Sequence, residues 1–105
     1  MDYVEEQINK LGSFEIDTEI VPGADSYRVD GKLFAIYVKD KTPKRLSLRG
    51  DTQLVKQLRE RYESVVQPAN LDIKTWNTYI LTEQLDTDFI TSMIIHSYIS
   101  SGGEY

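Results

Sequence analysis

The chain has 105 residues, a formal net charge of -5 at pH 7 and no cysteine. This length predicts one domain, and the absence of cysteine excludes disulfides, thiolate metal sites and cysteine nucleophiles. The acidic first residues carry no signal-peptide pattern and no apolar run approaches the ~18 residues of a membrane span, so we expect a cytoplasmic protein without membrane segments.

Two elements are predicted before the turn at Pro22-Gly23. Residues 2–11 place apolar side chains at helical spacing and acids near their start, where carboxylates complement the helix dipole. Residues 14–20 alternate apolar and acidic side chains with period two. That alternation predicts a strand with one buried face and one solvated acidic face.

A hairpin is predicted around Asp30-Gly31. Residues 26–29 and 32–38 are apolar segments on either side, and Asp-Gly between two strands suits a type I′ turn because both central positions need positive φ. The second strand is apolar on both faces, which predicts a place in the middle of a sheet.

The next elements are a strand and a helix. Residues 45–49 place Leu46 and Leu48 on one face of a strand and polar side chains on the other. Residues 52–62 carry apolar side chains at helical spacing after polar residues that suit a helix N-cap.

The last third predicts two strands and a closing helix. Residues 65–66 form a short strand, residues 76–81 a longer one, and the helix ends near Ser100. We expect Trp76, the single tryptophan, to lie in the core. Tyr79 has the opposite phase on the same strand, so it is the aromatic that we expect to be exposed.

These elements predict one α+β domain over residues 1–99. It has two layers, with N- and C-terminal helices covering one face of an antiparallel sheet. Residues 100–105 are expected to be a mobile tail.

Several short pieces of the chain form an ordered pattern over residues 26–99. They are Gly31-Lys32 with Phe34-Ala35, Leu48-Arg49, Leu54 with Leu58-Arg59, Pro68 with Leu71, Trp76-Asn77-Thr78, and Ser97-Tyr98. In this order and spacing they resemble the MmcQ/YjbR family. The resemblance implies a fold like that of bacterial frataxin (CyaY-like) and DNA binding through wing-like hairpins of the sheet. The chain departs from the family pattern at residues 70–75, where the family often has histidine and lysine.

The leading functional hypothesis is a binding module for DNA or another polyanion. Residues 26–74 hold eleven basic and six acidic residues, whereas the segments on either side are acidic. Basic side chains in hairpins would contact phosphates and give affinity without reading sequence. The alternatives are that charges complement each other between packed elements, or that lysines only keep turns solvated. The candidate residues are Arg28, Lys32, Lys39, Lys41, Lys44, Arg45 and Arg49.

A second hypothesis places function on the acidic N-terminal region. Its helix and strand each present carboxylates on one face, which would suit a protein partner or weak binding of a hard cation. Of these two, the resemblance in fold to frataxin implies weak binding of a metal cation. The alternative is a solvated acidic surface. The candidate residues are Asp2, Glu5, Glu6, Glu15, Asp17 and Glu19.

We expect no enzymatic activity and no cofactor. His96 is the single histidine, and no carboxylate lies four residues away on the predicted helix. The chain has no P-loop, no Gly-x-Ser-x-Gly sequence and no Gly-rich phosphate loop. These absences favour a binding module.

Overall fold

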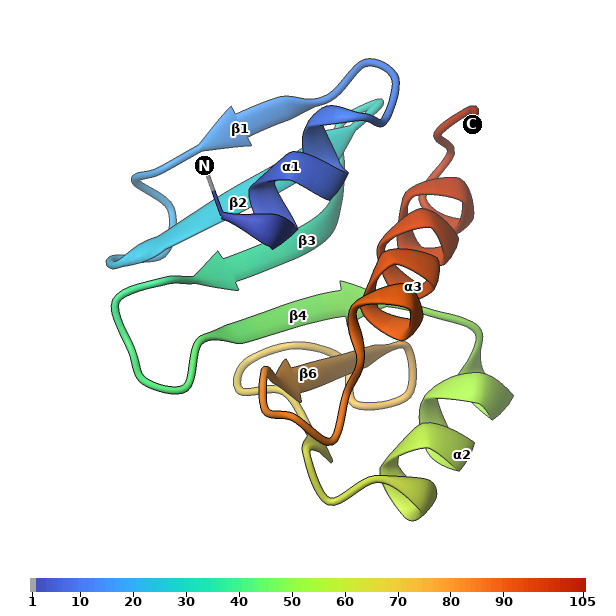
Figure 1. Cartoon of the computed structure of the whole chain (residues 1–105). Coiled ribbons are helices and arrows are strands. Elements are labelled where there is room, and N and C mark those ends of the chain that lie inside the picture. The colour runs from blue at the N-terminus through green and yellow to red at the C-terminus, as the bar shows by residue number, and fades with distance from the viewer. Residues whose placement is uncertain (1) are drawn as a thin grey trace.

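Six strands form one open sheet in the computed structural model, which describes residues 2–105 (Figure 1). The strands are β1 (Glu15–Asp17), β2 (Ala24–Val29), β3 (Lys32–Val38), β4 (Arg45–Arg49), β5 (Val65–Val66) and β6 (Trp76–Ile80). They lie in the order β1-β2-β3-β4-β6-β5, and all neighbours pair antiparallel.

Three helices are found in the same described residues: α1 (Tyr3–Asn9), α2 (Thr52–Arg61) and α3 (Thr87–Ser100). Figure 1 shows α1 and α3 in front of the sheet. On this same side, the buried Asn77 of β6 donates its Nδ2 to the Val55 carbonyl of α2 at 3.1 Å. The predicted α+β class is therefore confirmed, with an antiparallel sheet and terminal helices on one face. The likeness to bacterial frataxin stays a prediction.

No helix described in residues 2–105 is both long enough and apolar enough to cross a bilayer.

The hairpin between β2 and β3 turns at Asp30-Gly31, as predicted. The two residues have φ values of 50° and 76°, the positive values that a type I′ turn requires. β3 then passes through the middle of the sheet, where Phe34, Ala35 and Tyr37 are at most 1% exposed.

Alternation along β4 divides the two faces of the sheet. Leu46 and Leu48 are buried in the main core, beside Tyr37 and Ala35 of β3. Because successive side chains of a strand point to opposite faces, Arg45, Ser47 and Arg49 lie on the face away from the helices. The sheet thus has one helix-covered face and one helix-free face.

Ser97 joins α3 to the two central strands. Its buried hydroxyl donates to the Phe34 carbonyl of β3 at 2.5 Å and accepts from the Arg49 backbone N–H of β4 at 2.9 Å. Both strand groups are thereby satisfied by one side chain. This contact sets the position of α3 over the sheet.

The strand predicted over residues 14–20 is shorter and less buried than expected. β1 covers only three residues, and Ile16 and Ile20 are 54% and 52% exposed. The Asp17 carboxylate accepts from the backbone N–H groups of Glu19 and Ile20, so the chain turns away there instead of continuing the ladder. Since β1 is an edge strand, no other strand within residues 2–105 covers it on its outer side.

Trp76 is buried as predicted, but the prediction for Tyr79 is wrong. Each of them is 3% exposed, although they point to opposite faces of β6. Tyr79 joins the helix-side core and contacts the ring of Phe89. Trp76 lies on the helix-free face under the guanidinium of Arg49, whose carbon is 4.8 Å from the ring centroid. The alternation of side chains along β6 could not predict which aromatic is exposed, because both faces of this strand are covered.

The end of the chain continues from α3 by backbone hydrogen bonds. The backbone N–H of Ser101 donates to the carbonyl of Ser97, and that of Gly103 donates to the carbonyl of Tyr98. A Cβ at Gly103 would lie 2.3 Å from the Tyr98 ring, so this close approach requires glycine. The mobility of residues 100–105 stays a prediction.

Replacing Ser97 with alanine is expected to destabilise the fold. Ser97→Ala leaves the buried carbonyl of Phe34 and the part-buried N–H of Arg49 without this partner, which costs about 1–3 kcal/mol of unfolding free energy. Urea unfolding followed by circular dichroism measures this loss. Ser100→Ala removes an exposed hydroxyl one turn later and should stay within about 0.5 kcal/mol of the parent. Equal stabilities of the two variants would contradict the role of Ser97.

Candidate functional site

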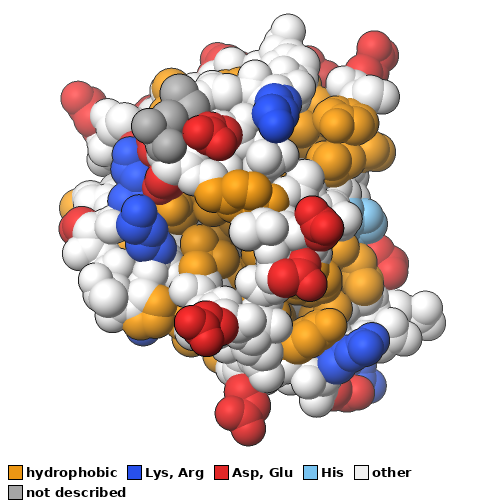
Figure 2. Space-filling view, viewed as in Figure 1, with side chains coloured by type: hydrophobic (Ala, Val, Ile, Leu, Met, Phe, Trp, Pro, Cys, Tyr) orange, Lys and Arg blue, Asp and Glu red, His pale blue; other side chains and the backbone are white. Residues whose placement is uncertain are grey.

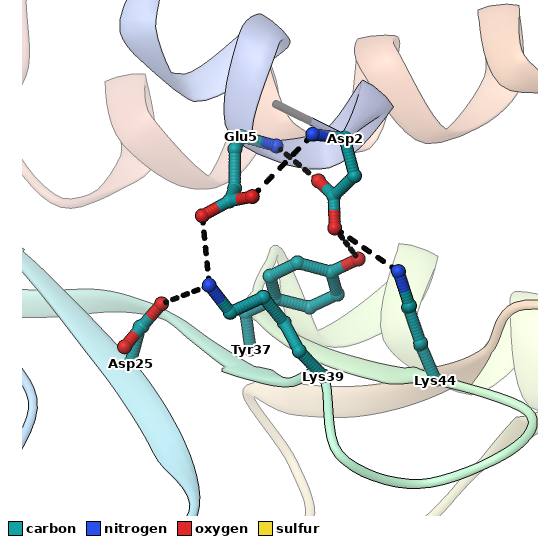
Figure 3. A network of polar contacts seen from close by, with 6 residues as sticks. All are labelled: Asp2, Glu5, Asp25, Tyr37, Lys39 and Lys44. Atoms are coloured by element: carbon teal, nitrogen blue, oxygen red, sulfur yellow. Dashed lines mark hydrogen bonds and ion pairs between the residues drawn. The ribbon is translucent and has the colours of Figure 1, made fainter.

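The start of α1 is held to the sheet by Asp2 (Figure 3). One carboxylate oxygen of Asp2 caps the helix by accepting from the Glu5 backbone N–H at 2.9 Å. The other oxygen accepts from the Tyr37 hydroxyl at 2.7 Å and pairs with Lys44 Nζ at 3.3 Å. A capping residue thus also joins α1 to β3 and to the loop after β3.

Lys39 completes this cluster. Its Nζ lies 2.9 Å from a carboxylate oxygen of Glu5 and 3.3 Å from one of Asp25, and these two acids raise the pKa of Lys39. We call the cluster the α1 anchor; its residues are Asp2, Glu5, Asp25, Tyr37, Lys39 and Lys44. Two of the basic candidates are therefore neutralised, in part by two of the acidic candidates.

Arg49 is also engaged within the fold. Its Nε and one terminal nitrogen donate to the Leu33 carbonyl at 3.2 and 3.1 Å, while the guanidinium covers Trp76. A half-buried side chain with these contacts closes the helix-free face and is not presented to a polyanion.

Arg28 and Lys32 lie far from the loop that carries the other lysines. They flank the β2–β3 turn, and the Arg28 guanidinium donates to the Gly31 carbonyl at 3.3 Å. The loop over residues 39–44 leaves the other end of β3, roughly 20 Å away at ~3.3 Å per residue. The seven basic candidates therefore do not form one surface.

Figure 2 likewise shows no single basic surface on the face that it presents. Basic side chains on the helix-bearing side stand singly or in small groups among acidic ones.

Two basic candidates, Lys41 and Arg45, line the same groove. Both are exposed, and neither forms an ion pair with another residue of the described chain. They line a groove on the helix-free face, with a volume of about 360 Å³. We call it the back groove.

The floor of the back groove crosses four strands. Ile36 of β3 is opposite Ser47 of β4, Ser47 is opposite Thr78 of β6, and Thr78 is opposite Val66 of β5. The hydroxyls of Ser47 and Thr78 are 2.7 Å apart and share a hydrogen bond. Val21, Gln67 and residues 69–71 add side chains at the walls. No carboxylate is among the lining residues.

The acidic candidates are dispersed. Glu6 is exposed on α1, and Glu15 and Asp17 lie on edge strand β1, opposite Arg28 and Ser26 of β2. Glu19 is exposed beyond that strand. Within residues 2–105, no three carboxylates or histidines are grouped so that they could hold a metal ion.

His96 has a structural contact. Its Nε2 accepts from the backbone N–H of Asp51, the N-cap residue of α2, at 3.3 Å. The imidazole therefore joins α3 to the junction of β4 and α2.

Sequence reasoning missed most of the back groove. Arg45 and Ser47 could be placed on one face from the period of β4 alone. Thr78 and Leu71 carry no local signal, because their part in the groove depends on strand register and on a loop that crosses the sheet. A second basic group lines a smaller depression beside α2, of about 300 Å³, and was likewise not predicted; it consists of Lys56, Arg59 and Lys74.

The chain is similar to known proteins in both sequence and fold. A family model described as YjbR matches residues 13–99. No protein with a curated description matches the sequence. The solved structure of the Deinococcus radiodurans protein DR2400, described with a DUF419 domain, is 19% identical, with a TM-score of 0.86 over 92% of this chain and 74% of that one. A Pseudomonas syringae protein is 20% identical, with a TM-score of 0.75 over 95% and 93%.

The α1 anchor predicts a specific dependence of stability on pH. Burial alone would raise the pKa of Asp2, but the Glu5 N–H, the Tyr37 hydroxyl and Lys44 together lower it below its ordinary value of 3.8. The unfolded chain then binds more protons in that range, so the stability that Asp2 supplies is present above pH 3.8 and is lost as the pH falls below it.

Asp2→Asn keeps a helix-capping side chain and removes the charge. Urea unfolding over a pH series should show a parent more stable than this variant at about pH 6, with the difference shrinking through and below the ordinary pKa of Asp. Glu83→Gln, an exposed carboxylate outside the α1 anchor, is the control. A constant difference between the parent and Asp2→Asn would contradict this role of Asp2.

Proposed function

The chain belongs to the YjbR family, and from this premise we propose that it is a non-catalytic binding module that holds an anionic ligand at Lys41 and Arg45. DNA or another polyanion is the ligand that the resemblance to the family implies. The observation that carries the proposal is that these two cations are unpaired within the described chain and line one groove that has no carboxylate.

The proposed mode differs from binding by several hairpins at once. Lys39 and Lys44 are neutralised in the α1 anchor, and Arg28 and Lys32 lie at the other end of β3. A polyanion would therefore be held at one local point by two cations. Such contacts engage phosphates without reading bases.

The non-catalytic part of the proposal rests on His96 and on the acids. His96 already accepts a backbone hydrogen bond, and Asp2 and Glu5 are engaged in the α1 anchor. A general base needs a free acceptor within reach of substrate. The same engagement of Asp2 and Glu5 leaves the acidic hypothesis, a protein adaptor or weak metal binder, without an observation that favours it.

The test is binding of a labelled mixed-sequence DNA duplex and of inorganic polyphosphate, followed by fluorescence anisotropy and by calorimetry over a salt series. Two phosphate contacts predict a slope of roughly -2 for the logarithm of the DNA affinity against that of salt concentration. The double variant Lys41→Glu with Arg45→Glu should bind at least about tenfold more weakly at low salt, because both cations are reversed.

A matched control reverses two exposed lysines beside α2. Lys56→Glu with Lys74→Glu changes the net charge equally but leaves the back groove intact. Lys39→Gln with Lys44→Gln should reduce stability and leave the affinity of the folded protein nearly unchanged. If neither polyanion binds at low salt, or if the α2 variant loses binding as much as the groove variant, the proposed site is wrong.

A further inference from the structure

We propose that the back groove binds a small amphiphilic anion: one acidic head group at Lys41 and Arg45, and an apolar body across the strands. This inference rests on the proposed function, since it uses the same two cations, and it adds the chemical class of the ligand.

The helix-free face carries apolar side chains that none of the described helices covers. Ile36, Val38, Val66 and Leu71 are only half-buried, and all four line the groove. Val21 and Ala69 add further apolar surface. Removing such surface from water is favourable, so a ligand with an apolar body would gain affinity here that a bare phosphate would not.

The cations and the apolar floor are continuous. Arg45 of β4 is opposite Val38 of β3. Two residues along the same strands, on the same face, Ser47 is opposite Ile36. A head group held by Arg45 would therefore leave its apolar body directly over Ile36 and the strands beyond it. Because no acid lines the groove, its charge complements an anion and disfavours a cationic ligand.

The hydroxyl pair supplies a polar contact in the floor. Ser47 and Thr78 together carry two donors and use one of them in their mutual hydrogen bond. The remaining O–H makes no other hydrogen bond with a described residue. When Thr78 donates within the pair, the free O–H is that of Ser47, which lies two residues from Arg45 on the same face of β4 and so faces the same anion.

The dimensions suit a small molecule. The volume of about 360 Å³ lies near the lower end of the range for small-molecule sites. The floor spans four strands, which is roughly 14 Å at ~4.8 Å between neighbours. A duplex is too wide to enter, so DNA would contact only the rim.

The experiment is isothermal titration calorimetry of the full chain with three probes. Octanoate has both parts of the proposed ligand, acetate has the head group alone, and octylamine has the body with the opposite charge. Octanoate should bind at least about tenfold more tightly than either, a gain that corresponds to burying as few as two methylene groups.

Variants separate the two halves of the groove. Arg45→Gln should weaken octanoate binding by removing the charge, and Leu71→Ser should weaken octanoate while leaving acetate unchanged. Lys56→Gln, on the α2 side, is the matched control and should change nothing. Proton NMR spectra of each variant establish that it is folded before titration.

The outcomes distinguish this inference from the proposed function. Equal affinities for octanoate and acetate would overturn the apolar body and leave the anion site standing. Octylamine binding as tightly as octanoate would overturn the charge selection. Binding of DNA or polyphosphate with none of octanoate would overturn the small amphiphile alone. If none of the anions tested binds, both the proposed function and this inference are wrong.

Discussion

Burial of Leu46 and Leu48 against the helices determines where every other side chain of β4 points. The strand has neighbours on both sides, and all helices of the described chain pack on one face. Period-two alternation then sends Arg45 and Ser47 to the helix-free face. With only loops to cover that face, half-buried apolar side chains and an unpaired cation remain beside each other. The back groove is a consequence of this one-sided packing.

Charge pairing within the fold decides which basic residues remain available. The acids that cap α1 also face the loop after β3, so Asp2 and Glu5 neutralise Lys44 and Lys39. The acidic start and the basic centre of the sequence thus compensate each other in part through packing. Among the basic candidates, Lys41 and Arg45 are the two cations without an ion pair in the described chain that line the same groove. The specificity of the proposed binding therefore depends on this site, because a fold does not imply a function.

The same fold occurs in proteins that share only about a fifth of their residues with this chain. At 19% and 20% identity, the proteins from Deinococcus radiodurans and Pseudomonas syringae share the architecture with this chain. Gln67 and residues 69–71, which form one wall of the groove, belong to a loop between β5 and β6. Loops vary in length and sequence more readily than the elements they join, so a groove of this kind can change its ligand without changing the fold.

The sequence by itself determined the order and kind of the elements, the Asp30-Gly31 hairpin and the two faces of β4. These features depend on spacing over a few residues, which a chain records directly. Only the tertiary structure decided that Tyr79 is buried, that Ile16 is exposed on an edge strand, and that Lys39 and Lys44 are paired. It also placed Thr78 beside Ser47. Each of these outcomes depends on strand register or on packing between residues distant in the chain, and no local pattern encodes them.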